Sequence, residues 1–358
     1  MSQAKSQRPP FSSLPLDPSG PPGNAWGLYG PLDELGSLNL LTPSTVVAAA
    51  KEIQIGERIA LDWKLNNPSP PFFNREALNV KFYQKGERMV NDDVLYFNTQ
   101  CGSQWDGFRH YAYQQRRRYY GGRTQEQLAS SNSLGINVWV ENGGIVGRGI
   151  LIDYASYCEK HGKMIEPLKT GAISVKELKA VAEESKISPK IGDILFVRTG
   201  FTRAYAALSE MEAQALTERE SPSDFLGVEP SKETMQWIWE SGFAAVASDS
   251  PTFEQGPLVG PHNAPGGIWK GESWEQEMQC GGLLHQWLLA GWGTPIGEMF
   301  DLEALSKKCQ ELERWSFFIS SVLLNVSLTN VVRVGMKEKF RSKLTEIYLG
   351  ARWCREST

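Results

Sequence analysis

The chain has 358 residues, of which 41% are hydrophobic, and its formal net charge is -4. This size and composition predict a globular protein with one large domain or two ordinary ones, and the acidic balance argues against nucleic-acid binding, because phosphate contacts need a basic face. The five Cys include no CxxC pair, which argues against a disulfide framework and a structural zinc site and favours a reducing, cytoplasmic compartment. Without a secretory signal or an apolar run of about 18 residues, the sequence predicts no membrane span.

The first 25 residues are rich in Ser, Pro, Gln and Gly and lack hydrophobic periodicity. We therefore expect a flexible arm at 1–25, with ordered structure from about Trp26. Thr42 and Pro43 suit the N-cap and the first turn of a helix, which the alanine-rich stretch continues to Ala50.

Short apolar segments separated by turn residues predict strands along most of the chain. They lie at 59–63, 94–97, 137–140, 147–153, 193–200, 243–249 and 296–300. Of these, 94–97 is expected to be a buried strand that leads into the polar stretch after it. Ser174 and Glu177 form a capping box that predicts a helix through about Ser185. Alternating strands and helices predict an α/β domain with a mixed or parallel sheet.

Three further helices are predicted towards the end of the chain. The first spans 233–239 and ends at Gly242, the second starts at Gly281 and breaks at 293–295, and the third is capped by Asp301. The last one carries a stripe at helical spacing that we expect in the core: Leu302, Leu305, Cys309 and Leu312. No linker divides residues 26–330, so a single large domain is expected.

Four polar residues, Gln100, Gln104, Asp106 and His110, are separated by four, two and four positions. On an extended segment, where side chains alternate between faces, all four would point the same way and could converge on one ligand or ion. A hydrogen-bonded strand end without any catalytic role is the alternative. Histidine is rare in this chain, with four residues in total, which favours a functional site.

The order of several motifs resembles the cyclase family that includes bacterial kynurenine formamidase and isatin hydrolase. The resemblance covers most of the chain and rests on the segments 26–27, 36–43, 104–110, 147–153, 192–200 and 248–250, with His285 and Glu298. It implies a swivelling β/β/α fold in one domain with a mixed sheet, followed by a tail at 331–358 that departs from the family pattern.

The hallmark of that family is a segment of the form His-x-Gly-Thr-His-x-Asp-x-x-x-His. Its first two His and its Asp bind a divalent metal, and its last His acts as general acid or base. By resemblance, these positions fall on Gln100, Gln104, Asp106 and His110, so both metal-binding imidazoles of the motif are replaced by amides. The remaining metal-site residues of the family look like His285 and Glu298.

Amide oxygens are harder and weaker ligands than imidazole nitrogens, which are favoured by zinc. A site of Asp106, His285 and Glu298, with oxygens from Gln104 and Gln100, would lean towards manganese or magnesium. Three states stay open: a bound Mn²⁺ or Mg²⁺, a bound Zn²⁺, and a site without metal.

Three functions follow from the resemblance and its departures. The first is a metal-assisted hydrolase of an amide, lactam or ester bond, similar to the arylformamidases of tryptophan catabolism, with His110, Asp106 and Gln104 as catalytic residues. The second is a metal-independent cyclase, dehydratase or isomerase of secondary metabolism, in which Gln100 and Gln104 bind a carbonyl or enolate oxygen. The third is a non-catalytic relative that binds a small molecule.

Substrate contacts are expected from an apolar wall of Trp105, Phe108 and Tyr111, and from Arg198 at a strand end. For each of them a structural role in the core or in an ion pair is the alternative, as it is for Asp249. The basic run at 116–118 predicts a solvated loop. Two other histidines are expected outside the site, His161 on the surface and His262 in a surface loop or lid. Family resemblance also implies a homo-oligomer.

Overall fold

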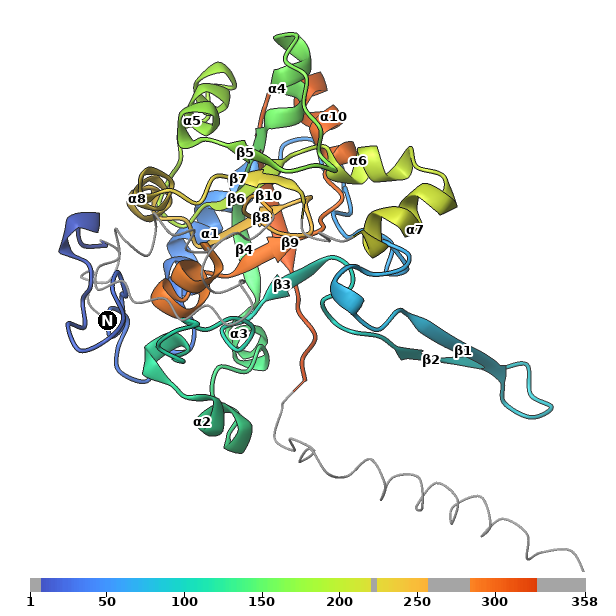
Figure 1. Cartoon of the computed structure of the whole chain (residues 1–358), viewed down its shortest axis with the longest axis horizontal. Coiled ribbons are helices and arrows are strands. Elements are labelled where there is room, and N and C mark those ends of the chain that lie inside the picture. Colours follow the sequence, from blue (N-terminus) through green and yellow to red (C-terminus); the bar gives the residue numbers. More distant parts are fainter. Residues whose placement is uncertain (1–7, 220–223, 257–283, 327–358) are drawn as a thin grey trace, which may run out of the picture.

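The computed structural model describes residues 8–219, 224–256 and 284–326. In this part of the chain the central sheet has six strands in the order β10-β4-β6-β8-β9-β3 (Figure 1). Strands β4, β6, β8 and β9 run parallel, whereas β10 and β3 are antiparallel to their neighbours at the two edges. The mixed sheet in a single α/β domain is therefore confirmed. Its strands are β3 (Gln104–Asp106), β4 (Ile145–Asp153), β6 (Ile194–Arg198), β8 (Ala245–Ser248), β9 (Ile296–Glu298) and β10 (Ser316–Ser321).

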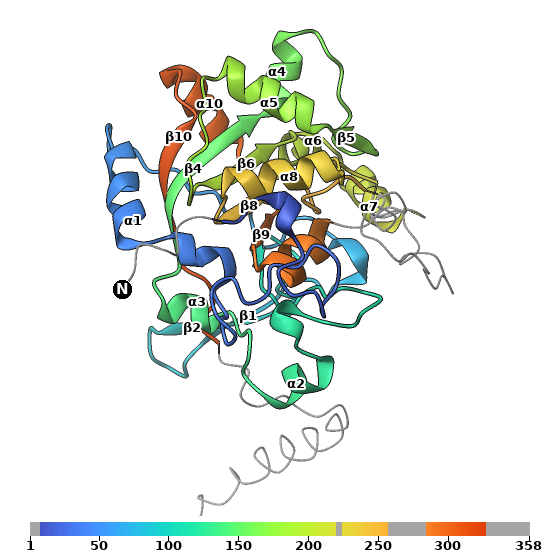
Figure 2. The same cartoon turned by 90° about the vertical axis from the view of Figure 1, so that its left-hand side faces the viewer.

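The parallel strands are buried on both faces, which explains why their sequences read as continuous apolar runs. Every residue of β6 and of β8 is buried. Figures 1 and 2 show α5 and α8 on one face of the sheet and α10 on the other. A separate parallel pair, β5 (Gly171–Ile173) and β7 (Leu226–Val228), lies outside the central sheet.

The helices begin where the sequence provides caps. The Thr42 side chain accepts a hydrogen bond from the Thr45 amide, and Ser174 forms the predicted capping box with Glu177. Gly242 ends α8 with a φ of 68°, a left-handed conformation that favours glycine. The described α-helices are α1 (Pro43–Ala49), α2 (Gln125–Ser130), α3 (Asn137–Glu141), α4 (Tyr154–Lys160), α5 (Val175–Glu184), α6 (Phe201–Ala206), α7 (Glu210–Glu218), α8 (Lys232–Ser241) and α10 (Glu303–Leu312).

Two predicted strands are wrong. Residues 137–140 form helix α3, because a run of four apolar residues is too short to distinguish a strand from a buried helical turn. Residues 59–63 form no strand, and their one backbone bridge joins Asp62 to Phe300, just after β9. Three residues of the predicted core stripe in the last helix are buried, whereas Leu312, at the helix end, is 40% exposed.

The strand predicted at 94–97 exists, but it is not buried. It belongs to β2 (Asn91–Tyr96), which pairs with β1 (Asn79–Gln84) in an antiparallel hairpin that projects from the body (Figure 1). Val94 and Leu95 are 51% and 49% exposed. Apolar composition predicted burial, and the hairpin's position outside the body prevents it.

Residues 8–25 lie against the body despite their lack of hydrophobic periodicity. Phe11 is buried and its ring packs edge-on against Trp292 at a centroid distance of 6.3 Å. Arg8 donates hydrogen bonds to the carbonyls of Trp239 and Phe243 at the end of α8. None of the described helices is long and apolar enough to cross a membrane. His262 and the tail at 331–358 lie outside the described residues.

Candidate functional site

Strand β3 places two of the four motif residues on one face at the sheet edge. Gln104 pairs in register with Glu298 of β9, and Asp106 projects to the same side of β3 as Gln104 because side chains alternate. Trp105 therefore points to the opposite face, where it packs against Phe196 and Phe300 at ring-centroid distances of 6.3 and 5.1 Å. The prediction that Trp105 contacts substrate is not supported, since strand alternation puts it in the core.

The two glutamines bind the carboxylates of the cluster directly. Gln100 lies in the turn before β3, and its Nε2 donates to Asp106 Oδ1 at 2.6 Å. Gln104 Nε2 donates to Glu298 Oε2 at 2.8 Å and to Gln100 Oε1 at 3.3 Å. The four motif residues do converge, but through a turn rather than along one extended strand as predicted.

His285 joins this cluster from a distant part of the sequence. It stands at the start of the π-helix Gln286–Trp292, and its Nε2 lies 3.1 Å from Glu298 Oε1 and 3.4 Å from Asp106 Oδ2. The contact with Asp106 is ionic rather than a hydrogen bond. The structure thus brings together Asp106, His285 and Glu298, three of the five residues that were predicted to form a metal site.

Glu254 is a member of the cluster that sequence reasoning missed. Its Oε2 lies 2.7 Å from His285 Nδ1, and its Oε1 accepts from the backbone amide of His285 at 3.1 Å. The one available signal was position, because Glu254 follows the carboxyl end of β8, and ligand sites in α/β sheets gather at those ends. The two contacts fix both the ring orientation and the backbone of His285.

His110 occupies the open side of the cluster. Its side chain is 28% exposed, and its Nε2 lies 3.8 Å from Asp106 Oδ2, beyond hydrogen-bond distance. The Tyr111 ring lies 5.6 Å from that of His285, so Tyr111 borders the site as predicted for a substrate contact. Burial raises the pKa of Tyr111 to about 12, so its phenol keeps its proton and can donate a hydrogen bond.

The pKa values of the two histidines shift in opposite directions. Burial alone would lower the pKa of His285, but the charge of Glu254 and hydrogen bonds to the surrounding carboxylates raise it well above its ordinary value. Desolvation lowers the pKa of His110 despite the nearby Asp106 charge. His110 is therefore neutral at pH 7.

The pKa values of Asp106 and Glu298, which both contact His285, also shift in opposite directions. Burial opposes ionisation of Asp106, yet the charges of His110 and His285 and the hydrogen bond from Gln100 lower its pKa to about 2. Burial and the Asp106 charge raise the pKa of Glu298 to about 7. Three carboxyl groups thus face one imidazolium, which gives the cluster an excess of negative charge that would attract a cation.

The cluster fits a divalent cation by its geometry and its unsatisfied oxygens. Asp106, His110 and His285 each offer one ligand atom, and these atoms lie within 4.8 Å of one another. Asp106 Oδ2 and Gln104 Oε1 are buried without a hydrogen-bond partner. Buried polar atoms are rarely left unpaired, so these two oxygens are available to coordinate an ion.

Phe108 and Arg198, two other predicted substrate contacts, are structural. Phe108 is fully buried and packs against Tyr120 and Trp139. Arg198 is 1% exposed and its guanidinium binds Asp153 at 2.7 Å and Glu303, which joins the ends of two strands to α10. Neither side chain reaches the cluster, because core packing and a buried ion pair hold them elsewhere.

Asp249 and His161 also have the structural roles offered as alternatives. Asp249 is buried and accepts backbone hydrogen bonds from Thr199, Gly200 and Phe201 at the start of α6. His161 is exposed at the surface, where it contacts Glu184. Arg116, Arg117 and Arg118 are exposed, as expected for a solvated loop.

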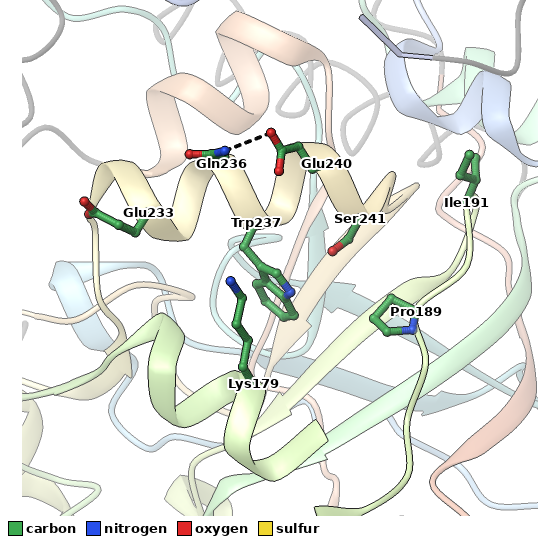
Figure 3. A pocket seen from close by; sticks show the side chains of 8 residues that line it. All are labelled: Lys179, Pro189, Ile191, Glu233, Gln236, Trp237, Glu240 and Ser241. Carbon is green, nitrogen blue, oxygen red and sulfur yellow. Dashed lines mark hydrogen bonds between the residues drawn. The ribbon is translucent and has the colours of Figure 1, made fainter. Parts of the chain in front are cut away.

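A groove of about 490 Å³ lies between α5 and α8 (Figure 3). Lys179, Glu233, Gln236 and Trp237 are among its lining residues, and Gln236 donates to Glu240 within the helix. None of the residues of the carboxylate and histidine cluster lines this groove. We therefore place the candidate active site at the edge of the sheet and not in this groove.

Comparisons with known proteins show the family of the chain. Residues 41–255, more than half of the chain, match the Cyclase family model, described as "Putative cyclase". The chain belongs to the cyclase family. No curated protein sequence matches the chain significantly.

One solved structure shows the same fold. A protein described as a novel cyclase is 25% identical in sequence, with a TM-score of 0.69 over 86% of this chain and 96% of its own. Two isatin hydrolase A structures are more distant. The enzyme from Labrenzia aggregata, bound to benzyl benzoate, is 13% identical, with a TM-score of 0.45 over 75% of this chain and 88% of its own. That from Ralstonia solanacearum is 16% identical, with a TM-score of 0.45 over 72% and 85%.

Proposed function

We propose that this cyclase-family protein is a metal-assisted hydrolase of an amide, lactam or ester bond. The observation that carries the proposal is the contact between Glu254 and His285 Nδ1, at 2.7 Å. A carboxylate that accepts a hydrogen bond from one ring N–H leaves the other nitrogen, once it has lost its proton, available to bind a metal, and metal-binding histidines are commonly held in this way. Here the free nitrogen, Nε2, faces Asp106 and Glu298.

The residues that would hold the ion are Asp106, His285 and Glu298, with Gln104 and Gln100 offering amide oxygens. Four oxygen donors and one nitrogen suit Mn²⁺ or Mg²⁺ better than Zn²⁺, which prefers imidazole and thiolate. The Gln104 amide would have to turn its Oε1 towards the ion, and this oxygen is the atom left without a partner. When bound, the metal would polarise the substrate carbonyl and acidify water.

His110 is the residue we assign to proton transfer. Its lowered pKa leaves it neutral at pH 7 and able to accept a proton from the attacking water. Its partial exposure leaves room for water and substrate beside the ring. After the carbon–heteroatom bond breaks, the same imidazolium returns the proton to the leaving nitrogen or oxygen. Asp106 orients this histidine electrostatically, and Tyr111 can hold the substrate by hydrogen bonding.

The substrate class follows from resemblance rather than from the pocket. Arylformamides, the substrates of kynurenine formamidases, are the first compounds to test, followed by lactams and aryl esters. An arylformamidase would place the protein in tryptophan catabolism and in the cytoplasm. These assignments are part of the proposal.

A metal-independent cyclase, dehydratase or isomerase is the second candidate, and one observation favours it. The amide nitrogens of Gln100 and Gln104 already satisfy Asp106 and Glu298, and the His285 imidazolium balances part of the negative charge. In that reaction the amides would bind a substrate oxygen while His110 moves protons. Retention of Asp106, His285 and Glu298 in one cluster supports the hydrolase over this alternative.

Turnover with and without metal distinguishes the two candidates. The purified protein is assayed with N-formylkynurenine, isatin and an aryl ester, before and after chelation and after Mn²⁺ is added back. The hydrolase predicts that chelation abolishes turnover of one of these compounds and that Mn²⁺ restores it. Equal turnover after chelation, with no metal found by elemental analysis, would refute the proposal.

A further inference from the structure

Arg75 carries a positive charge beside the candidate site and has no part in the reaction proposed above. It follows the 3₁₀ helix Phe72–Asn74, and its Nη1 donates to the backbone carbonyl of Gln100 at 2.6 Å. The Gln100 side chain in turn donates to Asp106 at 2.6 Å. One glutamine residue therefore links the guanidinium to the carboxylate cluster.

The half-buried Arg75 side chain has no carboxylate partner. Among the residues that the structure describes it forms no ion pair, and the bond to Gln100 is the one hydrogen bond of its guanidinium. By contrast, Arg198 is held by the carboxylates of Asp153 and Glu303. An arginine side chain has five N–H groups in a planar fork that matches a carboxylate. Most of these groups in Arg75 are therefore available to an anionic ligand.

The residues before Arg75 hold its guanidinium in place. The central carbon of the guanidinium lies 4.8 Å from the centroid of the Phe73 ring, which is a cation–π contact. Phe73 and Asn74 have φ values of 61° and 54°, in the left-handed region that residues other than glycine rarely adopt. Such conformations occur preferentially at functional sites. A cation that is oriented before its ligand arrives loses less entropy when the ligand binds.

The path through Gln100 limits the distance between Arg75 and the cluster. From the bond lengths of one glutamine and the two hydrogen bonds of 2.6 Å, the guanidinium lies within about 12 Å of the Asp106 carboxylate. A small molecule with an aromatic ring or a short chain between two polar groups can contact both ends. The cluster itself carries an excess of negative charge, so a singly charged carboxylate is favoured beside it over a phosphate.

We propose that Arg75 binds a carboxylate of the substrate, several bonds away from the bond that is hydrolysed. The inference rests on the proposed hydrolase, whose substrates it narrows to amides, lactams or esters that carry a carboxylate. Arg75 is then a specificity residue and takes no part in proton transfer. A neutral substrate of the same shape would leave the guanidinium without its counter-charge and bind more weakly.

Direct binding tests the assignment without turnover. Titrations of the full chain, followed by NMR of the ligand, compare 3-phenylpropanoate with 3-phenylpropanamide, which has nearly the same shape but no charge. The wild type should bind the carboxylate about 10- to 100-fold more tightly than the amide, the usual range for hydrogen bonds to a charged group. Arg75→Gln should lose this preference. Arg88→Gln, which removes the same charge at an exposed position, should keep it.

A ratio of two affinities separates recognition of the anion from a structural role of Arg75. If Arg75 only held the loop at Gln100, its replacement would change the affinities for both ligands alike. Arg75→Lys covers the case in which Arg75→Gln does not fold. Lysine keeps the charge but cannot form two parallel hydrogen bonds to a carboxylate, so the preference should fall by a few-fold.

The outcomes distinguish this inference from the proposed hydrolase. A preference for the carboxylate that depends on Arg75 supports the anion site, even if chelation has no effect on turnover and the hydrolase fails. Equal affinity of the wild type for the two ligands, or no binding of the carboxylate, would overturn the anion site. So would a preference that is unchanged in the folded Arg75 variants, and metal-dependent turnover of a neutral aryl ester would then leave the hydrolase standing.

Discussion

The two sides of the candidate site are built differently. Its deep wall consists of Glu254, His285 and Glu298, which are at most 5% exposed and bind one another at 2.7 and 3.1 Å. Its open wall consists of Gln100, Gln104 and His110, of which His110 has no contact with the other cluster residues closer than the 3.8 Å to Asp106. The deep wall is fixed by ion pairs and suits holding a cation. The open wall leaves an imidazole free to move protons.

The largest expected effect is on catalysis from the open wall. His110→Ala should lower kcat by about 10²- to 10⁴-fold, the usual contribution of a general acid or base. Its unfolding temperature should change little, because the side chain is partly exposed and makes no hydrogen bond within the cluster. His161→Ala, at an exposed histidine away from the site, is the control. Full activity of His110→Ala would remove it from the mechanism.

The deep wall should instead govern stability. His285→Ala leaves three buried carboxyl groups without their cation, and breaking a buried ion pair in this way costs about 3–5 kcal/mol of unfolding free energy. Urea denaturation in metal-free buffer measures this loss, with His110→Ala as the matched variant from the open wall. If the two variants are equally stable, the contrast between the walls does not hold.

The contact of Glu254 with His285 should strengthen metal binding, because it holds the imidazole in place. Glu254→Gln keeps the size of the side chain but removes the charge that orients the imidazole, and losses at such positions are about 10- to 100-fold. Calorimetric titration with Mn²⁺ measures the effect, and Glu240→Gln, on α8 at the groove between α5 and α8, serves as control. A Glu254→Gln protein with wild-type Mn²⁺ affinity would mean that Glu254 has no part in the site.

The pH dependence of metal binding follows from Glu298. Its pKa is raised to about 7 in the metal-free protein, so below pH 7 it is protonated and must release its proton to bind an ion. The His285 imidazolium must also release a proton, so affinity for Mn²⁺ should fall as pH drops from 8 to 6, by at most about tenfold per pH unit for each proton released. Glu298→Gln should bind more weakly and lose part of this slope. An affinity independent of pH would contradict the assignment.

The smallest expected effect is an increase in zinc affinity. Gln104→His restores an imidazole where the family motif has one, and imidazole nitrogen is the better ligand for Zn²⁺. Zinc affinity should rise by a few-fold, as measured by competition with a chromophoric chelator. Gln114→His, at an exposed position after the motif, controls for an added surface histidine. No gain from Gln104→His would place residue 104 outside the coordination sphere.

Much of the fold could be predicted because local signals and burial agree. The capping box at Ser174 and the apolar run of β6 each specify one structure, and both were predicted correctly. The helix at Asn137 was not, because four apolar residues fit a strand equally well. The hairpin strand β2 was assigned correctly but placed in the core, since sequence does not show which apolar strand leaves the body.

The candidate site was predictable where residues are close in sequence or carried by the family motif. Gln100, Gln104, Asp106 and His110 meet as expected, and His285 and Glu298 join them. Glu254 was missed, because its place depends on how the chain turns after β8. Trp105 and Phe108 were misassigned since an aromatic residue beside a catalytic motif can face either the site or the core.

Stoichiometric binding of Mn²⁺ to the metal-free protein tests the central claim most directly. Titration of the wild type should show one site per chain, and Asp106→Asn, which removes the charge of the oxygen left unpaired in the cluster, should abolish that binding while the chain remains folded. If the wild type binds no Mn²⁺ or Zn²⁺, or if Asp106→Asn binds as tightly as the wild type, the cluster of Asp106, His285 and Glu298 is not a metal site and the proposed hydrolase mechanism is wrong.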